Sequence, residues 1–497
     1  MSGKNLRGDA RPFYITTTLP YVNAPLHLGH ATEIIRADAI ARYKRLSGYE
    51  VFFNTGTDEH GMKILESAQK AGKPVLEFVD ECAVLFKETL QKFGVSSDTH
   101  YVRTTDTRHV VAVQEFWRRC AKNGFIYKKN YQAKYCVGCE EEKTDSELVN
   151  GKCPEHDRVP ELISEENYFF KLSAFEKPLL DFYNTHSEFV VPSYRLNELR
   201  EFIKRGLKDF SISRLKSKLP WGVPVPGDDT QTIYVWFDAL VNYISTLGWP
   251  AASEAAVAGK PDENLFDKFW VRGTPTQYCG KNNTRFQGLM WQAMLLAAGL
   301  PHTHTVVVDG FILGEEGTKM SKTLGNVIDP LEVVREYGTD ALRYFVLREF
   351  HPFEDTAVSK EKLKEWYNAN LADGLGNLVS RIITMGEKYG VPLGSVSQIG
   401  VIRDKSDVDL ENFDLKKYMD KVWSDIQALD KQIQEKQPFK VFKTDPKEAV
   451  EMVIDLYTKL AIIADLLTLV MPETALKIKN YLANPRKLKA PLFPRKE

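Results

Sequence analysis

Two histidines lie in a sequence pattern that could bind phosphate. In "TLPYVNAPLHLGHATEIIRADAIARY", residues 18–43, His27 and His30 flank Gly29 where a helical pattern begins. A helix start offers unpaired N–H groups and the positive end of the helix dipole, and glycine lets a ligand approach the backbone closely. His27 and His30 could therefore donate to phosphate oxygens as charge builds up in a transition state. The alternative is that both are incidental surface residues, because the four-residue pattern His-Leu-Gly-His is too short to be a specific signal.

Two lysines further along the chain could close over a polyphosphate. "GEEGTKMSKTLGN", residues 314–326, places Lys319 and Lys322 on a polar loop flanked by glycines. Such a loop suits closure over a bound ligand, with Lys322 balancing the charge of a leaving pyrophosphate. Taken alone, a lysine pair on a loop is more often solvated surface.

Four residues have the spacing of a structural zinc site. Cys136-x-x-Cys139 is followed, after thirteen residues, by Cys153-x-x-His156. Two short pairs separated by a loop supply the four ligands of tetrahedral Zn²⁺, and four protein ligands leave no open position for catalysis. We expect one structural zinc per chain, with reduced structural thiols as the alternative.

The segments that must position these residues show two kinds of sequence pattern. From about residue 10 to 350, strand-like runs such as "PFYITTTLP", "YEVFFNTGTD", "TIYVWFDAL" and "HTVVVDGFIL" alternate with helical segments, as in parallel α/β units. From about 358 to 485, long amphipathic stretches indicate an α-helical bundle. Residues 318–357 read as a linking region, and the tail "ANPRKLKAPLFPRKE" as an extended strap.

Composition bounds the remaining possibilities. The 497 residues exceed one hydrophobic core and predict about three domains or subdomains. The formal net charge is −1, so contact with nucleic acid requires a local basic patch. No run of about 18 apolar residues occurs, and the first ten residues lack the apolar core of a signal peptide. We expect a cytosolic enzyme with no membrane partner.

The histidine and lysine motifs, in this order, resemble the two signatures of class I aminoacyl-tRNA synthetases. The stretches "TLPYVNAPLHLGH", "NTGTDEHG", "FSISR", "YVWFDAL" and "TKMSKTLGN" resemble the methionyl-tRNA synthetase family over nearly the whole chain. The resemblance implies an α/β fold: a Rossmann-like parallel-sheet catalytic domain, split by a zinc-bearing connective insertion and followed by an all-α anticodon-binding helix bundle. The implied division is a flexible N-terminus (1–10), the catalytic halves (11–120 and 231–317), the connective insertion (121–230, with its zinc knuckle at about 132–166), the lysine loop with the stem-contact region (318–357), the bundle (358–485) and the C-terminal strap (486–497).

The resemblance also implies the reaction. The carboxylate of L-methionine attacks the α-phosphorus of ATP, giving methionyl-adenylate and pyrophosphate, and the terminal ribose hydroxyl of tRNA(Met) then attacks the activated carbonyl. Such phosphoryl transfer depends on positioning and charge stabilisation, with Mg²⁺ accompanying the ATP. His27, His30 and Lys322 match the family's phosphate-stabilising positions, Lys319 is a supporting contact, and Gly29 lies at the ATP site.

Two charged residues match positions that hold the amino acid. Asp58 follows an apolar strand, where the carboxyl end of a parallel strand meets the ligand crevice, and could pair with the substrate ammonium group. The alternative for Asp58 is a helix cap. Arg214 matches the family's partner arginine for this carboxylate network, and its alternative is a surface basic residue.

The methionine pocket is expected to be aromatic, because the substrate side chain is linear, apolar and polarizable. Asn282 occupies a position that corresponds to the family's ATP site. The positions that correspond to its methionine site are Leu19, Tyr21, Asp58, Trp236, Ala239, Leu240, Tyr243, Asn283 and Gln287. Four of these depart from the family's usual residues: Asn282 replaces an aspartate, Asn283 an isoleucine, Gln287 a histidine, and Leu240 a frequent proline. Asn283 and Gln287 make the far wall of the pocket more polar, which leaves room for altered analogue selectivity.

The helical half is expected to read the anticodon of tRNA. Asn377 and Arg381 lie four apart, hence on one helix face, and match the family's anticodon-contacting positions. Phe439 stands where the family usually has a tryptophan for stacking, so we expect weaker discrimination. The alternative for Asn377 and Arg381 is a solvated polar face.

Two other functions remain open. A synthetase for another small amino acid, such as cysteine, would place its metal in the amino-acid pocket, and no cysteine neighbours "TLPYVN". A non-catalytic tRNA-binding paralogue would keep the fold and lose adenylate formation. We expect a monomer, with the zinc knuckle shaping entry of the tRNA acceptor end.

Overall fold

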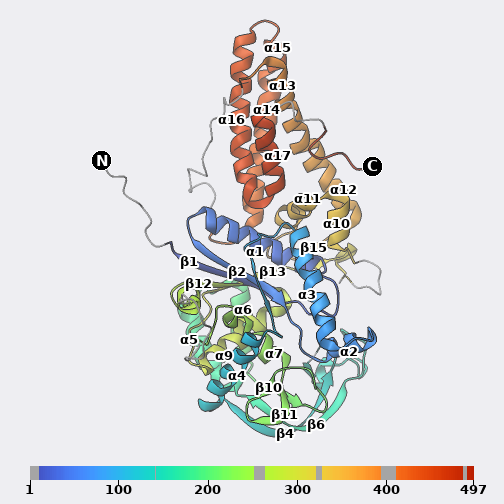
Figure 1. Ribbon diagram of the computed structural model, residues 1–497, viewed down its shortest axis with the longest axis vertical. Helices are drawn as coiled ribbons and strands as arrows, with labels where there is room; N and C mark the ends of the chain where they lie inside the picture. The colour runs from blue at the N-terminus through green and yellow to red at the C-terminus, as the bar shows by residue number, and fades with distance from the viewer. Residues whose placement is uncertain are drawn as a thin grey trace, which may run out of the picture. The chain divides into compact units, whose positions relative to one another are not determined.

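Short apolar and β-branched runs form a six-stranded sheet in the computed structural model, which describes residues 10–139, 141–250, 264–318, 320, 327–392, 410–484 and 490–497. The strand order is β3-β2-β1-β12-β13-β7, and β1 pairs in parallel with both β2 and β12 (Figure 1). Its strands are β1 (Pro12–Thr17), β2 (Glu50–Thr57), β3 (His100–Arg103), β7 (Val190–Val191), β12 (Thr274–Gly280) and β13 (Thr305–Asp309). The predicted parallel α/β sheet is confirmed.

The chain forms two compact units. Unit 1 comprises residues 1–25, 49–88 and 98–308, and unit 2 comprises residues 26–48, 89–97 and 309–497. The main sheet and the small antiparallel sheets belong to unit 1, whereas the long helices of the C-terminal half belong to unit 2.

Strand β1 is buried along its length, from Phe13 to Thr17. Burial on both faces is typical of parallel strands, which is why β1 reads as a continuous run rather than an alternating one. On β2, Gly56 lies opposite Val102 of β3, and a Cβ at Gly56 would come within 1.8 Å of the Val102 carbonyl oxygen. Only glycine allows β2 and β3 to approach this closely.

Helices connect and cover the sheet strands of unit 1. Aromatic rings fill the core between them, and Phe116, Trp117, Phe237 and Trp291 all belong to its largest apolar cluster. The helices are α2 (Met62–Lys70), α3 (Val75–Lys92, which ends in unit 2), α4 (Thr107–Lys122), α5 (Glu176–Thr185), α6 (Ser193–Lys204), α7 (Val235–Ala239), α8 (Asn242–Ser245) and α9 (Trp291–Ala297), with shorter turns η3 (Phe266–Val271), η4 (Lys281–Asn283) and η5 (Phe286–Met290).

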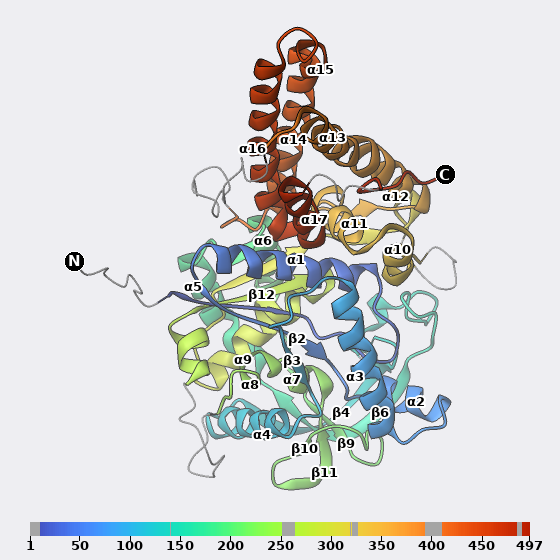
Figure 2. The same ribbon diagram turned by 45° about the horizontal axis from the view of Figure 1, so that its top comes forward.

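Two antiparallel sheets lie within the segment expected to be a connective insertion. Strand β4 (Ile126–Cys136) pairs with β6 (Glu161–Phe170), and Figures 1 and 2 both show these strands near β10 and β11. The remaining strands are β5 (Glu141–Lys143), β8 (Phe210–Ser211), β9 (Ser213–Leu215), β10 (Pro224–Val225) and β11 (Asp228–Ile233). Strand β7 lies in the same sequence range, yet it pairs with β13 of the main sheet.

One strand-like run is only partly extended. The prediction of a strand over "TIYVWFDAL" is correct as far as Ile233, where β11 ends, but wrong beyond it, because Val235–Ala239 form helix α7. A short apolar run does not distinguish a buried strand from a buried helix, since both bury every residue. This difference matters because α7 carries two residues predicted to bind methionine.

In unit 2, helix α1 (Leu28–Leu46) is held by buried charges. Arg36 pairs with Asp309 at 2.9 Å, and Asp38 pairs with Arg343 at 2.8 Å. Helices also occupy much of residues 330–349, within the 318–357 region that was expected to be a linker. The elements there are α10 (Pro330–Tyr337), α11 (Thr339–Tyr344), η8 (Phe345–Glu349) and the short parallel pair β14 (Ile312–Leu313) and β15 (Thr356–Ala357).

The predicted α-helical bundle is confirmed. Asp445 caps α16 by accepting from the backbone N–H of Glu448, with Pro446 at the first helical position. A Cβ at Gly386 would lie 1.9 Å from the Tyr457 hydroxyl, so this glycine lets α13 and α16 pack closely. Figures 1 and 2 show α14 beside α16. The helices are α12 (Lys360–Trp366), η9 (Tyr367–Gly376), α13 (Asn377–Tyr389), α14 (Leu415–Lys436), α15 (Pro438–Val441), α16 (Pro446–Val470) and α17 (Pro472–Ala483).

The last residues run in extended form against η9. The hydroxyl of Tyr367 donates to the carbonyl of Pro494, and Asn368 exchanges hydrogen bonds with the backbone of Lys496. Among the described residues, no helix is both long and apolar enough to cross a membrane.

Candidate active site

His27 and His30 form the start of helix α1 in unit 2. His27 is the N-cap residue: its Nδ1 accepts from the His30 backbone N–H at 3.3 Å, and the His30 Nδ1 accepts from the His27 N–H at 3.4 Å. The rings stack with centroids 3.6 Å apart, and a Cβ on Gly29 would touch the His27 ring at 3.0 Å. Spacing three apart thus lets each histidine cap the other.

Burial affects the protonation of this pair. It lowers the pKa of His27, and burial together with the charge of His27 lowers the pKa of His30 well below its usual 6.5. Both rings are therefore neutral at pH 7 in the free protein. A neutral imidazole carries one N–H donor, so each ring can still donate one hydrogen bond to a phosphate oxygen.

Asp58 lies in unit 1, directly after β2. Its backbone N–H donates to the carbonyl of Pro20, and its carbonyl accepts from the N–H of Val22, which brings it against Tyr21. The side chain is 4% exposed. Asp58 does not cap a helix, since the N-cap of α2 is Gly61. A buried carboxylate at the end of a parallel strand suits recognition of a cation.

The residue after Asp58 anchors the turn to its neighbours. Glu59 is fully buried, and its carboxylate accepts from Thr57 at 2.6 Å, from Arg103 at 2.7 Å and from Thr105. Its carbonyl accepts from the indole N–H of Trp221 at 2.6 Å. Every oxygen of Glu59 thus has a partner, and its role is to fix the turn rather than to meet a ligand.

Arg214 is buried rather than on the surface. Its guanidinium donates to the Ser211 hydroxyl at 2.7 Å and to the Ser213 carbonyl at 2.8 Å. It also lies 4.9 Å from the ring centre of Tyr135 and 4.5 Å from that of Tyr234, which is cation–π distance. This rigid placement is compatible with the predicted role in binding a carboxylate.

Several predicted methionine-binding residues lie together in unit 1. The ring of Trp236 stacks on Phe286 with centroids 3.7 Å apart. Tyr21 and Trp236 pack against one small apolar cluster, whose other members are Tyr135, Val137, Tyr234 and Val235. The structure therefore brings the first strand's end and α7 to the same place.

Other members of the set are buried in unit 1. Leu19, Ala239, Leu240 and Tyr243 are each no more than 9% exposed. The Tyr243 carbonyl accepts from the hydroxyl of Tyr14 on β1 at 2.9 Å. These four residues are placed where they can shape an apolar pocket.

The polar departures from the family pattern differ in their surroundings. Gln287 is 1% exposed and its Nε2 donates to the Thr18 hydroxyl at 2.8 Å, while its Oε1 is buried and has no hydrogen-bond partner among the described residues. The indole N–H of Trp236 is likewise buried and has no hydrogen-bond partner among the described residues. Buried polar atoms without partners are rare in native proteins, so these two are candidates for contact with a ligand or water. Asn283 is half-buried and Asn282 exposed.

The four predicted zinc ligands are clustered. The ligand atoms of Cys136, Cys139, Cys153 and His156 all lie within 4.8 Å of one another, with the sulfurs of Cys139 and Cys153 3.4 Å apart. Tetrahedral zinc with bonds of about 2.3 Å would separate two sulfurs by roughly 3.8 Å, which a small adjustment provides. A Cβ at Gly138 would meet the His156 ring at 2.4 Å, so glycine is required for the knuckle to close.

The predicted anticodon residues belong to unit 2. Asn377 begins α13, and Arg381 lies one turn later, where it forms an ion pair with Asp430 of α14. The Phe439 side chain on α15 is 46% exposed, so its ring is available for stacking. Lys319 and Lys322 lie outside the described residues.

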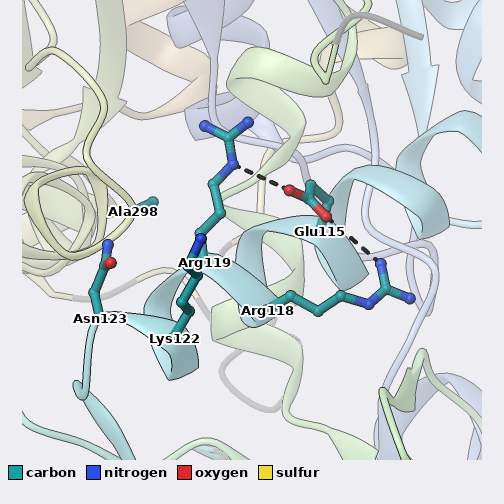
Figure 3. Close-up of a pocket in the computed structure, with 6 residues that line it drawn as sticks. All are labelled: Glu115, Arg118, Arg119, Lys122, Asn123 and Ala298. Atoms are coloured by element: carbon teal, nitrogen blue, oxygen red, sulfur yellow. Dashed lines mark hydrogen bonds and ion pairs between the residues drawn. The ribbon is translucent and has the colours of Figure 1, made fainter. Parts of the chain in front are cut away.

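A surface hollow of about 550 Å³ lies elsewhere in unit 1, at the C-terminal end of α4 (Figure 3). Arg119 and Arg118 both pair there with Glu115. None of the predicted site residues lines it. Cations at a helix C-terminus are stabilised by the helix dipole, so the basic side chains at the end of α4 need no bound ligand to explain them. Its lining residues are Glu115, Arg118, Arg119, Lys122, Asn123 and Ala298.

Sequence reasoning missed the residues that support Asp58. Glu59 and His60 stand in the quoted "NTGTDEHG", and Asp238 in the quoted "YVWFDAL", yet none was assigned a role. A charged residue within an apolar run was the available signal, because such a residue must find a buried partner.

Comparison with known proteins places this fold among the class I aminoacyl-tRNA synthetases. The family model described as "tRNA synthetases class I (M)" matches residues 13–158 and 146–383. The methionine–tRNA ligase of Caldanaerobacter subterraneus is 41% identical over 483 residues, covering 94% of this chain and 73% of the relative. The chloroplastic/mitochondrial methionine–tRNA ligase of Arabidopsis thaliana is 38% identical over 494 residues, covering 95% and 78%. The chain therefore belongs to the methionine–tRNA ligase family.

A solved structure agrees with this family over nearly the whole chain. The Mycobacterium tuberculosis methionyl-tRNA synthetase in complex with methionyl-adenylate has a TM-score of 0.84 and 33% identity, covering 98% of this chain and 97% of that one. The apo form of the same synthetase has a TM-score of 0.78 and 29% identity, covering 99% of each chain. The chain is accordingly an enzyme, an aminoacyl-tRNA ligase.

Proposed function

We propose that this chain activates L-methionine with ATP through Asp58, Arg214, His27 and His30, and then transfers the methionyl group to tRNA(Met). A buried carboxylate can bind the ammonium group of any amino acid, so the observation that carries the assignment to methionine is that Asp58 lies against Tyr21, which packs in one apolar cluster with Trp236. It pairs with the substrate ammonium group, while Tyr21, Trp236 and the apolar walls receive the thioether chain.

The activation step forms one bond and breaks one. A carboxylate oxygen of methionine attacks the α-phosphorus of ATP, and the bond to the bridging oxygen of the β-phosphate breaks, releasing pyrophosphate. His27 and His30 donate N–H groups to phosphate oxygens at the start of α1, and Lys322 balances the charge of the leaving pyrophosphate. Mg²⁺ enters with ATP as its counterion.

The transfer step uses the same adenylate. The terminal ribose hydroxyl of tRNA attacks the activated carbonyl, an ester forms, and AMP leaves. Asn377, Arg381 and the exposed ring of Phe439 meet the anticodon, with Phe439 stacking on a base. Phe439→Ala is expected to raise the KM for tRNA in charging and to leave methionine activation unchanged; equal KM values would overturn this assignment.

The Cys136 to His156 knuckle holds one structural Zn²⁺. Three sulfurs and one imidazole are the donor set that zinc prefers, and their clustering supports the assignment. Metal analysis of the purified protein is expected to find about one zinc per chain, and Cys139→Ser to lose it. Retention of full zinc by Cys139→Ser would contradict the assignment.

The experiment that tests the function is amino-acid-dependent ATP–pyrophosphate exchange, with methionine, cysteine, leucine, isoleucine and valine compared. Exchange with methionine alone is expected. Exchange driven best by cysteine would favour a different synthetase. No exchange from folded, zinc-loaded protein would favour a tRNA-binding paralogue without catalysis.

A further inference from the structure

A buried carboxylate joins three elements around the methionine-binding residues of unit 1. Asp238 is fully buried, and its two oxygens meet two different histidines: Oδ2 lies 2.6 Å from the His60 Nδ1, and Oδ1 lies 2.8 Å from the His109 Nε2. The His109 Nδ1 in turn lies 2.9 Å from the hydroxyl of Ser245. No step assigned above uses this network.

Each member comes from an element that carries or borders the site. His60 stands two residues after Asp58 in the turn that follows β2, and Asp238 stands on α7 between Trp236 and Ala239. His109 belongs to α4 and Ser245 to α8. Asp238 therefore ties the turn carrying Asp58 to the helix carrying two residues that line the proposed pocket.

The charge state fixes the direction of these hydrogen bonds. Burial alone would raise the pKa of Asp238, but the nearby His60 and His109 outweigh it and lower the pKa to about 2. Asp238 is thus an ionised acceptor at neutral pH, and both histidines donate to it. A donor bond to a charged acceptor is shorter and stronger than a neutral one, as the 2.6 Å separation from His60 reflects.

The turn has two anchors, one on each side. Glu59 fastens it to Arg103 and Thr105, and His60 fastens it to Asp238. The rings of Trp221 and His60 also meet in an edge-to-face contact, with centroids 5.5 Å apart. Asp58 directly precedes these anchored residues, so its carboxylate has little freedom while both anchors are intact.

We propose that Asp238 is a positioning residue for methionine recognition, acting through His60 to hold the Asp58 carboxylate where the substrate ammonium group binds. The inference rests on the proposed role of Asp58. Asp238 touches no substrate, and its contribution is to keep Asp58 preorganised, so that binding does not have to order the turn.

The test uses two inhibitors that each carry half of the methionine head group. 3-(Methylthio)propylamine keeps the ammonium group and lacks the carboxylate, and 4-(methylthio)butanoate keeps the carboxylate and lacks the ammonium group. Their Ki values are measured against methionine in ATP–pyrophosphate exchange. Asp238→Asn is expected to raise the Ki of the amine about tenfold, the size of one hydrogen bond to a charged group, and that of the butanoate less than about threefold.

A second variant and a control keep the test decisive. His60→Gln replaces the rigid ring donor to Asp238 by a flexible neutral amide, which weakens the same link from the other side, and it is expected to reproduce the selective loss, including where Asp238→Asn folds poorly. Asp340→Asn changes a buried carboxylate of unit 2 that accepts from the Thr474 N–H, and is expected to leave both Ki values unchanged. Equal losses for both inhibitors in His60→Gln would show a merely structural role and overturn the proposal, as would no loss.

Asp58→Asn separates the two claims. If it leaves the amine Ki unchanged, the proposed role of Asp58 fails. If it raises the amine Ki while Asp238→Asn and His60→Gln do not, Asp58 keeps its role and only the positioning by Asp238 is overturned.

Discussion

The helix start at His27–His30 and the turn at Asp58–His60 are two proposed substrate-binding regions built in opposite ways. The two histidines cap each other across three residues, and both of their hydrogen bonds are local. The turn depends on partners far along the chain, with Arg103 44 residues from Glu59 and Asp238 178 residues from His60. A self-contained site tolerates changes elsewhere in the fold, whereas a site held by distant partners depends on the whole of unit 1.

This contrast suits the two tasks. A helix start presents N–H donors by its geometry alone, which is sufficient for phosphate oxygens. Selecting one amino acid needs a carboxylate fixed in an apolar surrounding, and fixing a buried charge requires several hydrogen bonds to it or to its neighbours.

The largest effect is expected at Asp58. Asp58→Ala leaves the methionine ammonium group unpaired in a buried site, at a cost of about 3–5 kcal/mol, which corresponds to a rise of roughly 10²- to 4 × 10³-fold in the KM for methionine. The KM for ATP should change little. Exchange kinetics with each substrate varied would check this, and a rise below tenfold would show that the ammonium group binds elsewhere.

The second effect concerns stability. Glu59→Ala leaves Arg103 with only the more exposed Asp80 as a partner, removes the acceptor of Thr57 and Thr105, and should lower the free energy of unfolding by about 3 kcal/mol, measured by urea denaturation. The matched control is Glu81→Ala, which breaks the exposed ion pair with Lys73 and should cost less than about 1 kcal/mol. Equal losses would mean that the turn is not held by long-range partners.

The third effect is catalytic. His30→Ala removes a donor from the phosphate site and should lower kcat for exchange by roughly 10²–10³-fold, with the KM for methionine nearly unchanged. The local nature of the site predicts that the methionine affinity measured by calorimetry stays the same. A parallel loss of methionine affinity would show that the two regions are not independent.

The smallest effect is a difference in pH dependence. Because the pKa of His30 is lowered in the fold, the unfolded chain binds more protons below about pH 6.5, and stability falls as the pH drops from 7 to 5. The pKa of Asp238 is lowered from 3.8 to about 2, so its contribution is present above pH 4 and is lost only between those two values. Thermal unfolding midpoints should therefore have a flatter slope between pH 7 and 5 in His30→Ala than in the unsubstituted protein.

The sequence reveals sites that are built from neighbouring residues better than sites that are held by distant partners. The histidine pair and the zinc ligands are each built within a short stretch. Spacing alone indicated the metal site, whereas the histidine pair needed the lysine motif and the family resemblance beside it. Asp58 could be proposed from its place after an apolar strand, but its supporting partners could not, because the links to Asp238 and His109 arise only after the sheet has brought distant segments together.

The fold followed a similar rule. Apolar runs predicted the parallel sheet and the helical bundle, since burial patterns are local properties of a segment. They did not predict that Val235–Ala239 turn into a helix, or that β7 joins the main sheet beside β13. Both depend on tertiary packing, as does the bond of Gln287 to Thr18, 269 residues away.

A crystal structure of the protein with L-methionine and a non-hydrolysable ATP analogue would show directly whether Asp58 binds the substrate ammonium group. We expect the methionine nitrogen at about 3 Å from the Asp58 carboxylate, with His60 still bound to Asp238, and phosphate oxygens of the analogue at a similar distance from the His27 and His30 rings. A methionine nitrogen bound by other groups, with Asp58 turned away from it, would overturn the proposed role of Asp58.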